Sequence, residues 1–107
     1  MPLFAFVGRD GPRGPELRRK HRPAHLERLE SMSAAGRIAH AGPLLDESRE
    51  PVGSLVLFEA DDLASARSFA EADPYVAHGV FASHEVHETR AVFPRERDVQ
   101  DRRSGAA

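Results

Sequence analysis

The order of its strand-like and helix-like segments constrains the fold of this chain more than any other feature. Four short segments suit β-strands: Leu3–Val7, Arg37–Ala41, Ser54–Ala60 and Val80–Thr89. Two helical segments separate them, one over Pro23–Ala35 and one that ends at Asp73. This βαββαβ order predicts an α+β fold of the ferredoxin-like type, with an antiparallel sheet and both helices on one of its faces.

Proline and glycine set the predicted ends of these segments. The Gly/Pro-rich residues 11–15 predict a mobile loop after the first strand. Pro23 lacks an amide donor and disfavours helical backbone at the residue before it, so we expect the first helix to begin there. Gly36 is well placed to cap the end of that helix. Gly42 and Pro43 are expected to end the second strand.

One face of the predicted sheet has no helix to cover it. The first and third strands carry the segments Leu3–Val7 and Leu55–Phe58, which are apolar on both sides. A sheet that exposes this much hydrocarbon to water is an association surface. We therefore expect a homodimer that forms through the open face.

Length and charge limit the remaining possibilities. A chain of 107 residues suits one domain over residues 1–93, with a charged, flexible tail over residues 94–107. Its 15 Lys and Arg against 17 Asp and Glu predict no nucleic-acid partner. The chain has no cysteine, which excludes disulfides and thiolate chemistry. No apolar run approaches the roughly 20 residues that a membrane span needs, so we expect a cytoplasmic protein without a membrane partner.

His25 and Asp73 are the candidate catalytic residues. His25 lies just inside the helix predicted to start at Pro23, where the helix dipole disfavours the imidazolium form, and a neutral imidazole can act as a general base. A packed histidine with satisfied nitrogens is the alternative. Asp73 before Pro74 is typical of a helix cap. A carboxylate that also reached the imidazole would orient the ring, and the topology predicts that the two residues meet at one end of the sheet.

The other histidines do not form a recognisable metal motif. His21 and His25 are four residues apart, but the predicted helix break at Pro23 separates them. His84 and His87 lie three apart on a predicted strand and therefore point to opposite faces. We expect neither a metal nor another cofactor.

Several short motifs, in their order and spacing, resemble the YCII-related family over about residues 3–93. They are Arg22-Pro23-Ala24-His25-Leu26, Gly36-Arg37, Ala41-Gly42-Pro43-Leu44, Gly53-Ser54, Ala72-Asp73-Pro74-Tyr75-Val76 and Gly79-Val80. The resemblance implies a dimeric α+β barrel of ferredoxin-like protomers, with His25 and Asp73 as an acid–base pair. It also implies a shared substrate pocket whose walls include Arg22, Gly42, Pro43, Ser54 and Tyr75. There Arg22 could hold a substrate carboxylate or phenolate.

Three functions are compatible with this resemblance. Some members of the family resemble dechlorinating or small-ring-processing enzymes. The leading hypothesis is therefore a cofactor-independent enzyme that carries out proton transfer, elimination or hydrolysis on a small organic acid or ring compound. The main alternative is a non-catalytic ligand-binding or accessory module, because a fold does not determine a function. A haem- or oxygen-using monooxygenase-like barrel is the third hypothesis.

Overall fold

The structure is a computed structural model that describes residues 1–95. Its elements are β1 (Leu3–Asp10), α1 (Gly14–Ala34), β2 (Ile38–Leu45), β3 (Pro51–Glu59), α2 (Leu63–Glu71), α3 (Pro74–Ala77) and β4 (Phe81–Thr89). The order confirms the predicted βαββαβ arrangement, with the short helix α3 added after α2. Within residues 1–95, no helix is long and apolar enough to cross a membrane. The predicted tail lies outside the described residues except for its first two.

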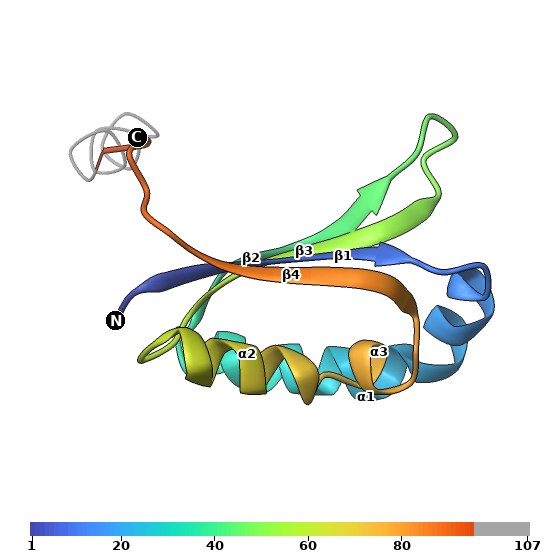
Figure 1. Cartoon of the computed structure of the whole chain (residues 1–107), viewed down its shortest axis with the longest axis horizontal. Helices are drawn as coiled ribbons and strands as arrows, with labels where there is room; N and C mark the ends of the chain where they lie inside the picture. The colour runs from blue at the N-terminus through green and yellow to red at the C-terminus, as the bar shows by residue number, and fades with distance from the viewer. Residues whose placement is uncertain (96–107) are drawn as a thin grey trace, which may run out of the picture.

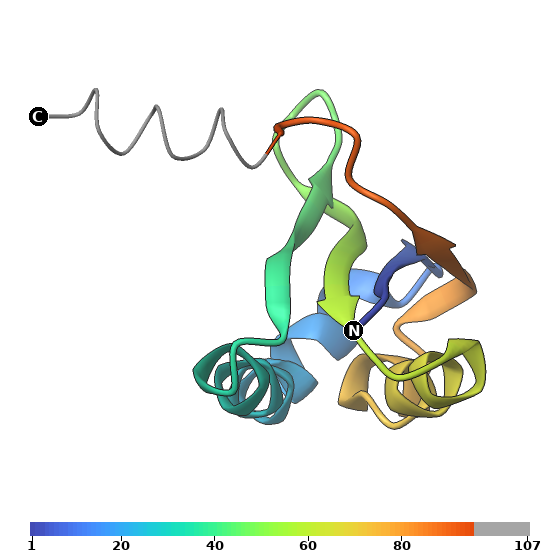
Figure 2. The ribbon, with the colours of Figure 1, turned by 90° about the vertical axis from the view of Figure 1, so that its left-hand side faces the viewer.

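The strands form one antiparallel sheet in the order β2-β3-β1-β4. This is the strand order of a ferredoxin-like domain, so the predicted α+β fold class is confirmed. All the helices lie on one face of the sheet, and the opposite face is uncovered (Figure 1). Figure 2 shows α1 and α2 side by side beneath the sheet.

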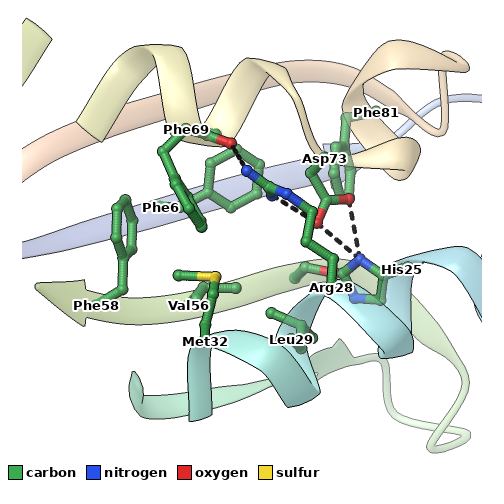
Figure 3. A pocket seen from close by; sticks show the side chains of 12 residues that line it. Phe6, His25, Arg28, Leu29, Met32, Val56, Phe58, Phe69, Asp73 and Phe81 are labelled. Carbon is green, nitrogen blue, oxygen red and sulfur yellow. Dashed lines mark hydrogen bonds and ion pairs between the residues drawn. The ribbon is translucent and has the colours of Figure 1, made fainter. Parts of the chain in front are cut away.

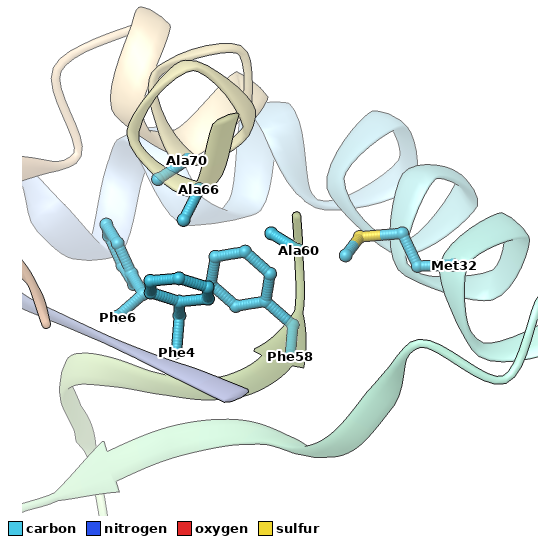
Figure 4. Close-up of a cluster of buried hydrophobic side chains, with 7 residues drawn as sticks. All are labelled: Phe4, Phe6, Met32, Phe58, Ala60, Ala66 and Ala70. Atoms are coloured by element: carbon cyan, nitrogen blue, oxygen red, sulfur yellow. The ribbon is translucent and has the colours of Figure 1, made fainter. Parts of the chain in front are cut away.

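The core fills the space between the sheet and the helices. Every second residue of β1 is buried, which is the two-residue period of a strand with one covered face. The rings of Phe4, Phe6 and Phe58 point from the sheet toward α2, where Ala66 and Ala70 face them (Figure 4). Small alanine side chains let the helix approach the aromatic layer closely.

The prediction that the first helix begins at Pro23 is wrong. α1 begins at Gly14, contains Pro23 and changes direction after its first turns (Figure 1). A proline inside a helix removes one backbone hydrogen bond and costs about 3 kcal/mol. Here the extra turns are anchored to the sheet by Arg18, whose guanidinium binds the Asp10 carboxylate at 2.7 and 2.8 Å. The helix does end as predicted, with Gly36 at φ 72° just after it.

The predicted end of the second strand at Gly42 and Pro43 is also wrong, because β2 continues through both residues to Leu45. β2 lies at the edge of the sheet, where a proline without an amide donor is tolerated. Only residues 46–50 then connect β2 to β3, in a tight turn. In that turn the Asp46 carboxylate accepts hydrogen bonds from the backbone amides of Ser48 and Glu50.

Candidate functional site

Two cavities that share part of their lining lie beneath the sheet. We call the first the outer cleft; it opens between α1 and the β2–β3 side of the sheet and has a volume of about 400 Å³. The second, the inner chamber, lies between α1, α2 and the sheet and has about 30 Å³ of free volume (Figure 3). His25, Leu29, Ser54 and Val56 line both cavities. Small-molecule sites usually have volumes of about 300–1,000 Å³, so of these two cavities it is the outer cleft that has room for a ring compound.

His25 and Asp73 meet at the boundary between these cavities. His25 Nδ1 lies 2.9 Å from Asp73 Oδ1 and 3.0 Å from Oδ2 (Figure 3). An ionised carboxylate can only accept hydrogen bonds, so Nδ1 is the protonated nitrogen. The other ring nitrogen, Nε2, points away from Asp73 (Figure 3) and has no hydrogen-bond partner among residues 1–95. In the neutral ring Nε2 therefore carries the free lone pair.

Neighbouring groups fix the position of both side chains. Asp73 is the N-cap of α3 and accepts a hydrogen bond of 2.8 Å from the Tyr75 amide. The Tyr75 ring stacks on the His25 ring with centroids 3.8 Å apart and planes 8° apart. Arg28 Nη1 contacts Asp73 Oδ2 at 3.4 Å. The imidazole is thus held between a carboxylate at its edge and a phenol ring on its face.

The helix-dipole argument for His25 is wrong. The residue lies in the middle of α1, because that helix begins at Gly14, so the start of the helix does not act on the imidazole. The predicted meeting of His25 with Asp73 is nevertheless confirmed. Asp73 lies in the turn between α2 and α3, and it faces the middle of α1 rather than its start. Asp73 both caps α3 and contacts the His25 imidazole.

The residues predicted for the pocket wall all line the outer cleft: Arg22, Gly42, Pro43, Ser54 and Tyr75. Ser54 is buried, and its hydroxyl oxygen accepts a hydrogen bond of 3.1 Å from Arg18. Burial raises the pKa of the Tyr75 hydroxyl, so this group stays protonated at neutral pH. The structure brings these residues to one cavity, and their roles in binding stay predictions.

Three arginines of the site were not predicted from the sequence. Arg18 and Arg19 line the outer cleft. Arg28 donates to the Phe69 carbonyl oxygen and lies 3.9 Å from the centroid of the Phe69 ring. Burial lowers the pKa of Arg28, and the neighbouring Asp73 carboxylate opposes this shift.

The spacing of residues in α1 could have revealed Arg18. Residues 18, 22, 25, 29 and 32 recur at helical intervals and mark one face of a continuous helix. All but residue 32 line the outer cleft, and residue 32 lines the inner chamber. The expected helix break at Pro23 hid this pattern.

Three of the other histidines, His21, His78 and His84, take part in ring stacking. His21 lies on the same continuous helix as His25, and its ring stacks on that of His78 at 3.9 Å. His84 stacks against Phe6, with centroids 5.7 Å apart. Within residues 1–95, no group of three or more potential metal ligands is present.

Comparison with known proteins relates the chain to one family. Residues 2–90 match the YCII-related domain. Protein YciI of Escherichia coli O6:H1 is 37% identical over 97 residues, which cover 85% of this chain and 99% of the relative. An uncharacterized protein of Haemophilus influenzae is 33% identical over 96 residues, covering 84% and 98%.

A solved structure shares both sequence and fold. It is 5-chloro-2-hydroxyhydroquinone dehydrochlorinase (TftG) from Burkholderia phenoliruptrix AC1100, in complex with 2,5-dihydroxybenzoquinone. The two chains are 30% identical, with a TM-score of 0.73. The alignment covers 82% of this chain and 93% of the other.

Proposed function

The chain belongs to the YCII-related family, and on that premise we propose that it is a cofactor-independent enzyme acting on a small ring compound or organic acid. The observation that carries the proposal is the hydrogen bond of 2.9 Å between His25 Nδ1 and Asp73, which leaves Nε2 with a free lone pair. His25 also lines a cleft large enough for such a substrate. In this role His25 is the general base and Asp73 orients it.

Each neighbour of His25 has a part in the proposed proton transfer. Nε2 takes a proton from the substrate, and the ring becomes an imidazolium. Asp73 stabilises that charge through the Nδ1–H hydrogen bond, and the stacked Tyr75 ring keeps the imidazole from rotating. The proton can then return from Nε2 to the product or to a leaving group.

Elimination of hydrogen chloride is the reaction class that the comparison favours. The similar structure is named as a dehydrochlorinase and holds a dihydroxybenzoquinone. On a chlorinated hydroxyhydroquinone the ring first ketonises: one hydroxyl proton is lost and a proton is added at the chlorine-bearing carbon. The base then takes a proton from a second hydroxyl, and the electron pair left behind moves through the ring to form a new π bond as the carbon–chlorine bond breaks. Chloride leaves with the electrons of that bond, so no external oxidant or reductant is needed. A histidine base can serve this chemistry alone.

Chloride release tests this proposal. Incubation of the protein with 5-chloro-2-hydroxyhydroquinone, the substrate for which the similar structure is named, is expected to release chloride faster than buffer does. Binding of 2,5-dihydroxybenzoquinone without turnover of this substrate or of related halogenated phenols would instead support the ligand-binding module.

We also propose that the open face of the sheet pairs with a second copy of the chain. Ala5, Val7, Leu55 and Leu57 lie opposite one another on the face away from the helices, and each is only partly buried. An unsupported apolar sheet face is stabilised when another apolar face covers it. Light scattering at micromolar concentration is expected to give twice the protomer mass. A protomer mass would contradict the pairing.

A further inference from the structure

The outer cleft has an unbalanced positive charge. Arg18, Arg19 and Arg22 line it together with His25, and none of its lining residues is an aspartate or glutamate. Arg18 is neutralised by Asp10 in a pair whose side chains are only 12% and 8% exposed. Arg19 and Arg22 have no hydrogen bond or ion pair with any side chain or backbone group among residues 1–95.

The other arginines of α1 show that these two differ from their neighbours. Arg13, near the start of the helix, binds Glu16 through two hydrogen bonds of 2.9 and 3.1 Å. Glu16, the acidic residue one turn before Arg19, is therefore already paired with Arg13. Arg28, near the end of the helix, contacts Asp73. Among the arginines of α1, the two without a hydrogen bond or ion pair within residues 1–95 are thus the two that line the cleft as exposed residues.

The remaining walls of the cleft are mainly apolar. Leu29 and Val56 line it on the side of the inner chamber, and Pro43 lines it on β2. Arg19 and Arg22 are three residues apart on one helix, so their side chains lie on neighbouring turns. An anionic group fits between two such guanidinium groups, which bind oxyanions through paired N–H donors.

We propose that the substrate is a ring compound that carries an oxyanion, held by Arg19 and Arg22, with its apolar body against Leu29 and Val56. This inference rests on the proposed function, because it places the reactive part of the same substrate beside His25 Nε2. The inference adds a substrate class to the proposed function. It also assigns to Arg19 the role of binding the substrate anion, which was expected from the sequence for Arg22.

Equilibrium binding of two matched pairs of probes tests the proposal. The first pair is 2,5-dihydroxybenzoate and its neutral amide, 2,5-dihydroxybenzamide, which isolates a carboxylate. The second pair is 2,5-dihydroxybenzoquinone, an acidic enol, and 2,5-dimethoxybenzoquinone, which cannot ionise and so isolates a ring oxyanion. In at least one pair the anion is expected to bind about tenfold more tightly than the neutral partner, the effect of one charge-assisted hydrogen bond.

Charge-neutral variants identify the residues that are responsible for the preference for the anion. The double variant Arg19→Gln with Arg22→Gln is expected to abolish the preference for the anion and to leave binding of the neutral probe unchanged. Lys20→Gln is the matched control, because Lys20 is exposed, lies between the two arginines and does not line the cleft. The preference is also expected to weaken as salt is added.

Three results would overturn the proposal. They are equal affinity for anion and neutral probe in both pairs, a preference that survives the double variant, and no binding of any of the four probes at millimolar concentration. Because binding is measured without turnover, the outcome is independent of catalysis. Chloride release without an anion preference would reject this inference and leave the proposed enzyme standing. An anion preference without turnover of 5-chloro-2-hydroxyhydroquinone or related halogenated phenols would reject the proposed enzyme and leave this inference standing.

Discussion

Replacement of His25 by glutamine is expected to lower kcat/KM by about 10²–10⁴-fold, the usual contribution of a general base. The glutamine amide can still donate a hydrogen bond to Asp73, but it cannot accept a proton from a substrate. Its length is similar to that of histidine, so the cleft should keep its shape. The rate of chloride release by the purified variant measures the effect.

His21→Gln is the matched control for this change. His21 lies one turn before His25 on α1 and also stacks on a ring, that of His78, but it does not line the outer cleft. The control is expected to keep nearly the activity of the unmodified protein. If the His25 variant stayed within about threefold of the unmodified protein, far below the usual effect of losing a general base, His25 would not be the base.

Replacement of Arg18 by alanine is expected to lower the free energy of unfolding by about 3–5 kcal/mol, the cost of leaving one member of a buried ion pair without its partner. The Asp10 side chain is 8% exposed and would lose both hydrogen bonds from Arg18. The Gly53 carbonyl and the Ser54 hydroxyl would each lose a donor as well. For a domain of this size the midpoint of thermal unfolding should fall by more than about 10 °C.

Two further variants show whether the effect comes from the buried charge. Arg13→Ala breaks the ion pair with Glu16, whose side chains are 66% and 63% exposed, and should leave the midpoint unchanged. Adding Asp10→Ala to the Arg18 variant is expected to restore part of the lost stability, because no unpaired carboxylate then remains in the interior. A loss in the Arg18 variant no larger than that in the Arg13 variant would show that Arg18 does not anchor α1.

These stability predictions also explain why the length of α1 could not be read from the sequence. The rule that a proline ends a helix describes the local backbone, and it correctly locates a weak point at Pro23. Whether the helix continues depends on contacts with distant residues, and Arg18 makes them with Asp10 on β1 and with Gly53 and Ser54 on β3. The spacing of residues 18, 22, 25, 29 and 32 is compatible with a continuous helix, but the contacts that stabilise its first turns leave no local pattern in the sequence.

The end of β2 also could not be predicted from the local sequence. Pro43 suggested the end of a strand, and only the position of β2 at the edge of the sheet makes a proline there acceptable. The order of the elements, in contrast, was predictable because the apolar segments and the glycines and prolines between them are local features.

The candidate site was predictable only in part, since its arginines at positions 18, 19 and 28 were missed. His25, Asp73 and the five expected wall residues come together as the resemblance to the family implied. Their mutual orientation depends on packing between elements: Tyr75 stacks on His25, and the turn before α3 carries Asp73 to the middle of α1. The positive charge of the cleft became visible only when the structure showed which arginines already have partners.

The central claim is that His25 and Asp73 act as one unit in proton transfer, and a double-mutant comparison of kcat/KM tests it most directly. Asp73→Asn keeps an oxygen that can accept the Tyr75 amide and so preserves the cap of α3, while it removes the charge that supports an imidazolium. The account predicts that Asp73→Asn alone lowers kcat/KM and that adding it to His25→Gln lowers kcat/KM no further, because residues that act together are not additive. If the double variant lost the product of the two single effects, or if either single variant kept full activity, the two residues would not form a catalytic pair.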